Sequence, residues 1–182
     1  PDVNRQNLLG EKTGENPMFR SFQEEYIGFL SAKDSEELIH EIGSWKKIVW
    51  DNTAAKKVYD YCGGHPLITR LFASQVCREG AQKAIDLERV EETALEIKRD
   101  LRKHEIGNYY QKGILELLRD DEQQALASIY KKGNEGYSET EMPVELEDAL
   151  ANLENFGLVA SDNGKLFIQA QLFNFWLERR WA

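Results

Sequence analysis

Apolar residues recur at helical spacing along almost the whole chain, and this period predicts a mainly helical fold with little strand. Glycine, proline and capping residues divide the pattern into separate helices. Ser31 precedes Asp34 at the spacing of a capping box, Asp51 suits the N-cap of the next helix, and Pro66 suits a first helical position. We expect helices at 31–43, with Gly43 as a left-handed stop, and at 51–63, 66–78 and 87–103.

The second half of the sequence has the pattern of a winged helix. One helix ends at Gly133, a second runs from 143 to 156, and the pair Asn163-Gly164 separates the short apolar runs 158–160 and 165–168. An Asn-Gly pair is the strongest short hairpin signal, because both turn positions favour a positive φ. Helix, turn, helix and hairpin together describe a winged helix. Further helices are expected at 114–118 and 172–181.

The composition excludes several classes of protein. The chain has 182 residues, and its formal charge of -9 provides no general attraction to phosphate backbones or anionic lipid. No apolar run approaches the roughly 18 residues of a membrane span. Two cysteines, Cys62 and Cys77, and three scattered histidines make neither a disulfide framework nor a zinc site. We expect a cytoplasmic protein without a metal and, since the chain begins at Pro1, a piece of a longer protein.

Motifs for catalysis or for phosphate binding are missing from the sequence. The one Gly-Lys pair is Gly164-Lys165, and Val159 stands where a P-loop needs its first glycine. Cys62 and His65 lie three residues apart across an expected helix end, with no neighbour that would orient the imidazole. We therefore expect no catalytic residue in this chain.

The most distinctive stretch of the sequence runs from Tyr59 to Phe72 and reads YDYCGGHPLITRLF. A helix stop followed by a helix start explains its glycines and proline. The stretch also resembles the G-x-P element, often GGHPLLL, in the helical lid of the STAND class of AAA-related ATPases, which includes the archaeal-type ATPase group. Segments 16–19 and 26–31 resemble the turn and helix start before the lid. Segments 156–159 and 173–177 resemble the wing and closing helix after it, so the resemblance covers most of the chain.

This resemblance implies the C-terminal part of a nucleotide-dependent switch, with the P-loop, Walker B acid and first sensor in a missing N-terminal part. In such lids the G-x-P turn approaches the adenine, a role that would fall to Gly64, His65 and Pro66. Leu67 stands where related lids place an arginine that senses the γ-phosphate, which favours a slow switch over a motor. The implied organisation is the polar end of the NTPase core at 1–25, a helical lid at 26–106 and a winged-helix domain at 107–182.

The same resemblance implies that the parent protein binds ATP or ADP and hydrolyses ATP slowly. It would couple its nucleotide state to a protein effector or to self-association through the lid and winged helix. ATP is not expected to bind tightly to this chain alone. A basic stripe of Lys98, Arg99, Arg102 and Lys103 shares one helix face. It is either a solvated, salt-bridged face or a contact for phosphate or a partner.

The alternative function is a winged-helix DNA-binding regulator or an origin-recognition-like protein. Such a protein would bind duplex DNA through Lys165 or the basic stripe. The expected recognition helix argues against it, because residues 144–156 contain neither lysine nor arginine but four acids: Glu145, Glu147, Asp148 and Glu154. These charges would repel phosphates instead of releasing counterions. Nucleic acid is thus the less favoured partner, and a membrane partner is not expected.

Overall fold

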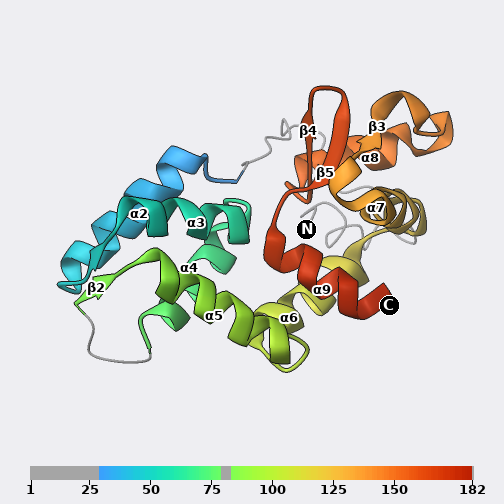
Figure 1. The fold of residues 1–182 in the computed structure, drawn as a ribbon. Helices are drawn as coiled ribbons and strands as arrows, with labels where there is room; N and C mark the ends of the chain where they lie inside the picture. Colours follow the sequence, from blue (N-terminus) through green and yellow to red (C-terminus); the bar gives the residue numbers. More distant parts are fainter. Residues whose placement is uncertain (1–28, 79–82, 182) are drawn as a thin grey trace, which may run out of the picture.

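The computed structural model describes residues 29–78 and 83–181. It confirms a mainly helical fold with a small β-hairpin (Figure 1). In the first half, two-residue strands β1 (Val49–Trp50) and β2 (Ala84–Ile85) pair in parallel, with Trp50 opposite Ile85. The helices of this half are α2 (Ala32–Trp45), α3 (Asn52–Cys62), α4 (Pro66–Val76) and α5 (Leu87–Asp100).

The second half contains a small antiparallel sheet with the strand order β3-β5-β4. The strands are β3 (Tyr137–Ser138), β4 (Val159–Asp162) and β5 (Lys165–Ile168). Its α-helices are α6 (Glu105–Tyr109), α7 (Asp120–Lys132), α8 (Glu147–Asn155) and α9 (Gln171–Trp181). A π-helical turn, Tyr110–Ile114, continues α6, and 3-10 turns lie at Leu115–Leu117, Gly133–Glu135, Glu139–Glu141 and Val144–Leu146.

Several helix ends form where capping chemistry predicts them. The Ser31 hydroxyl accepts a hydrogen bond from the amide of Asp34 at 3.1 Å, and Asp51 accepts one from the amide of Thr53 at 2.7 Å. Gly63 ends α3 in the left-handed conformation with φ 61°. The hairpin turn between β4 and β5 has φ 53° at Asn163 and 74° at Gly164, as the Asn-Gly pair predicted.

Gly43 was wrongly predicted as a helix stop. Helix α2 continues through Gly43 to Trp45, and the left-handed residue that turns the chain is Lys47, with φ 59°. A Cβ atom on Gly43 would lie 2.9 Å from the carbonyl oxygen of Ile48 and 2.9 Å from the Trp50 ring. The glycine therefore permits close approach of β1 to the helix, a tertiary requirement that a local pattern does not reveal.

Other differences are confined to short segments. Helix α5 ends at Asp100 instead of 103, and the helix expected at 143–156 begins as a 3-10 turn. Strand β3 was not predicted, because two residues are too few to show alternation. The predicted segment 1–25 and the motifs before Phe29 lie outside the described residues.

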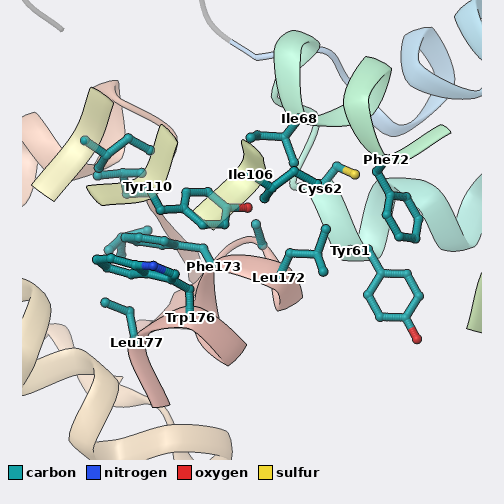
Figure 2. Packing of buried hydrophobic residues seen from close by; sticks show 14 of the residues in the cluster. Tyr61, Cys62, Ile68, Phe72, Ile106, Tyr110, Leu172, Phe173, Trp176 and Leu177 are labelled. Atoms are coloured by element: carbon teal, nitrogen blue, oxygen red, sulfur yellow. The ribbon is translucent and has the colours of Figure 1, made fainter. Parts of the chain in front are cut away.

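One hydrophobic core extends across both halves of the chain. Figure 2 shows Tyr61, Cys62 and Phe72 of the first half beside α9. The Phe173 ring of α9 lies 4.9 Å from the Tyr110 ring and stacks on Trp176 at 6.0 Å, and Phe175 lies 6.5 Å from Tyr61. Thus α9, the last element in sequence, packs against α3 and α5 of the first half.

Helix α6 contains the predicted boundary between residues 106 and 107. Ile106 and Gly107 are buried, and a Cβ atom on Gly107 would overlap the carbonyl oxygen of Leu101. The two halves are thus joined by a closely packed backbone at this point. Within the described residues, no helix has the length and apolar character needed to cross a bilayer.

Candidate functional site

The turn from Gly63 to Pro66 joins α3 to α4 in a conformation that requires glycine. Gly63 and Gly64 have φ values of 61° and 73°, and both are buried. The carbonyl oxygen of Gly64 accepts a 2.9 Å hydrogen bond from the amide of Leu30, and a Cβ atom on Gly64 would overlap the carbonyl oxygen of Leu30. The turn is therefore pressed against the chain that enters α2.

His65 is the N-cap of α4, and Pro66 is its first helical residue. Nδ1 of His65 accepts a 3.2 Å hydrogen bond from the amide of Leu67, and Nε2 lies 2.8 Å from the Tyr109 hydroxyl. The ring stands edge-on to Tyr109, at 5.1 Å and 84°, and lies 4.5 Å from the ring of Phe29. Burial lowers the pKa of His65 to about 4, so the imidazole is neutral near pH 7.

The turn also contacts the second half of the chain. Nε2 of Gln169 donates a 3.0 Å hydrogen bond to the carbonyl oxygen of Gly63, and Ala170 lies against the same glycine. The turn 63–66 therefore contacts three separate parts of the chain: the segment entering α2, helix α6, and the link from β5 to α9. The partners Phe29, Tyr109 and Gln169 were missed by sequence analysis, because nothing in the local pattern shows which distant side chain reaches the turn.

A small cavity of about 10 Å³ lies beside the turn, lined in part by Cys62, His65 and Tyr110. That volume is near the lower limit for one water molecule. The Tyr110 hydroxyl is buried and has no hydrogen-bond partner among the described residues, so it is the polar group that such a water would satisfy. Pro66 is exposed, and His65 and Tyr109 are half-buried, so a larger ligand would approach the turn from outside.

Two side chains of the basic stripe, those of Lys98 and Arg102, contact α9. The Lys98 ammonium lies 2.8 Å from a Glu178 carboxylate oxygen and 4.2 Å from the Phe175 ring centre. Arg102 donates to the carbonyl oxygen of Arg179. Lys103 lies 3.7 Å from Asp100, and both side chains are exposed, as is Arg99. Half of the stripe therefore holds the last helix in place, and Arg99 and Lys103 face solvent.

The helix expected to read DNA is acidic on its surface. Glu147, Asp148 and Glu154 of α8 are exposed, and Val144, just before the helix, is 77% exposed. Partial burial, together with the neighbouring carboxylate of Glu139, raises the pKa of Glu154. Among the described residues, no group of three or more histidine, cysteine, aspartate or glutamate side chains is arranged to hold a metal ion.

No family model and no curated protein sequence matches the chain. Among solved structures, the chain is similar to RuvB of Thermotoga maritima, a Holliday junction branch migration motor. The TM-score is 0.39, with 16% identity over 78% of this chain and 47% of that one. A mutant of the same RuvB gives a TM-score of 0.40 and 15% identity over 78% of this chain and 46% of that one. The chain spans about half the length of these structures.

Proposed function

We propose that this chain is the C-terminal lid and coupling region of a cytoplasmic, ATP-dependent switch protein of the AAA-related class. The observation that carries the proposal is the position of the Gly64–His65–Pro66 turn. This turn combines a sequence that resembles a nucleotide-contacting element with hydrogen bonds to both halves of the chain.

The packing of the turn supports a coupling role. ATP or ADP bound to a preceding NTPase core would contact the turn from its exposed Pro66 side. A shift of Gly64 would move Leu30, because their backbones are hydrogen-bonded and in close contact. The same shift would displace Tyr109 through its hydrogen bond with His65. It would also displace the link from β5 to α9 through the hydrogen bond of Gln169 with Gly63. The nucleotide state would thereby reach the second half, which we interpret as a winged helix.

The output of this switch is a contact with a protein effector or with another copy. The exposed acids on α8 would be repelled by the phosphates of DNA, which disfavours the DNA-binding alternative. The sequence contains no P-loop. The proposed signalling role does not require one in this chain, because the chain would couple to the nucleotide and not hydrolyse it. Hydrolysis of ATP, slow because Leu67 replaces an arginine, would belong to the preceding core.

The test uses the full-length natural protein. Its sequence before Pro1 should contain a P-loop, and the protein should bind fluorescent ADP. Hydrogen exchange should then show nucleotide-dependent protection in the Gly64–Pro66 turn and in α9. Absence of a P-loop, or exchange that nucleotide leaves unchanged in both segments, would overturn the proposal. A parallel titration with fluorescent duplex DNA at low salt tests the alternative, and tight salt-sensitive binding would favour it.

A further inference from the structure

The hydrogen bonds of His65 have a fixed direction. A neutral imidazole carries one N–H, and its other nitrogen accepts. Nδ1 accepts from the amide of Leu67 and therefore carries no hydrogen. The hydrogen is on Nε2, which donates to the oxygen of the Tyr109 hydroxyl at 2.8 Å. Burial lowers the pKa of His65 and so favours this neutral form.

The direction of this bond determines what the Tyr109 hydroxyl can do. Its oxygen accepts from His65, so its own hydrogen remains to be donated. His65 is its one hydrogen-bond partner among the described residues. Burial also raises the pKa of Tyr109, so the hydroxyl keeps its hydrogen at neutral pH. The chain of bonds from Leu67 through His65 thus ends in a half-buried donor.

We propose that the Tyr109 hydroxyl is a binding contact of this turn, donating a hydrogen bond to an acceptor atom of the nucleotide, and that His65 is its positioning residue. This inference rests on the proposed function, and it names the contacting group within that site. It also assigns His65 a different task, because both of its ring nitrogens are occupied within the protein.

The packing around Tyr109 is consistent with a fixed contact. A Cβ atom on Gly113 would lie 2.8 Å from the Tyr109 ring, so the π-helical turn after α6 packs closely on one side of the tyrosine. The His65 ring packs nearly perpendicular to it as well, at 84° between planes. A hydroxyl held in this way loses little side-chain freedom when a ligand binds, which favours affinity.

Two substitutions in the full-length protein test the inference. Tyr109→Phe removes the hydroxyl and keeps the ring, and His65→Asn keeps an N-cap acceptor but not the reach to Tyr109. Each should raise the Kd for ADP about fivefold, the usual effect of one hydrogen bond. The double variant should be no weaker than Tyr109→Phe alone, because both changes remove the same contact.

Matched controls separate this contact from a structural role. Tyr137→Phe removes a hydroxyl of β3 that donates to the carbonyl oxygen of Glu141, and His104→Asn changes the N-cap histidine of α6. Both should leave the Kd for ADP unchanged. Unfolding midpoints of the four single variants should be similar, so that a selective loss of affinity reports on binding.

Histidine nitrogen NMR shifts provide a readout that does not depend on nucleotide. His65 should show the Nε2–H tautomer in the wild-type protein and in Tyr109→Phe. The Nδ1–H tautomer, or a Kd for ADP that Tyr109→Phe leaves unchanged in a protein that binds ADP, would overturn this inference. If the wild-type protein bound no nucleotide, that result would contradict the proposed function itself. The tautomer of His65 would still test the direction of its hydrogen bonds.

Discussion

Arg179 of α9 donates from Nη1 to the carbonyl oxygen of Arg99 in α5 at 2.8 Å, and Arg102, two residues after the end of α5, donates in return to the carbonyl oxygen of Arg179. The last carbonyl groups of a helix have no partner within that helix. Arg179 therefore provides a partner for a carbonyl group at the C-terminal end of α5, and Arg102 provides one at the C-terminal end of α9. These two hydrogen bonds and the neighbouring Lys98–Glu178 ion pair connect the second half of the chain to the first.

Lys98→Met should lower the free energy of unfolding by about 0.5–1 kcal/mol, because it removes a half-buried ion pair but keeps an apolar stem against Phe175. Glu178→Gln should cost less, since the ammonium group keeps its contact with the ring. Urea unfolding measures both, and added salt should reduce the differences. Lys33→Met is the control, because the Lys33–Glu37 pair is largely exposed and should contribute almost nothing. An equal loss in the control would contradict the prediction.

Gly64→Ala should destabilise the protein far more than Gly164→Ala, although the two residues have nearly the same φ, 73° and 74°. A Cβ atom on Gly164 would have nothing within 4 Å, so that substitution costs about 1–2 kcal/mol for the left-handed conformation alone. At Gly64 the methyl group would also overlap the carbonyl oxygen of Leu30. Urea unfolding of the two variants measures this difference. Equal midpoints for Gly64→Ala and Gly164→Ala would disprove the explanation.

Glu122→Ala should cost about 3 kcal/mol, because this fully buried carboxylate has several donors that would lose their partner. It accepts from the amide of Arg119 at 2.8 Å and from Asn152 at 3.0 Å, and lies 3.2 Å from the Arg119 guanidinium. Asn152→Ala removes one of these bonds and should cost about 1 kcal/mol. Thermal or urea unfolding would refute the prediction if both variants lost the same stability.

Acidification should destabilise the protein in part through His65. Its pKa is about 4 in the folded chain against 6.5 ordinarily, so between these pH values the unfolded chain binds more protons. The free energy of unfolding should therefore fall as the pH drops from 6.5 toward 4, with no effect of His65 above about pH 7. Urea unfolding at pH 7.5 and pH 5 should show a smaller loss for His65→Asn than for the wild type. Equal losses would mean that His65 is not buried as a neutral group.

The sequence predicted the parts of this fold that depend on local chemistry. Ser31, Asp51 and Gly63 each act within one turn of chain, and Asn163 with Gly164 fixes a two-residue loop, so neighbouring residues suffice to predict them. Gly43 failed because its role depends on Trp50 across a tertiary contact. The same limit applies to the candidate site. The turn was found from its residues, whereas Tyr109, 44 positions away, is brought to His65 by packing alone.

The close fit of Gly107 under the carbonyl oxygen of Leu101 restricts how this protein can move. Bending between α5 and α6 would drive backbone atoms together at a place where no side chain can rotate aside. This joint is therefore unsuited to act as a hinge. A swing that separated the two halves would have to pivot elsewhere along the chain.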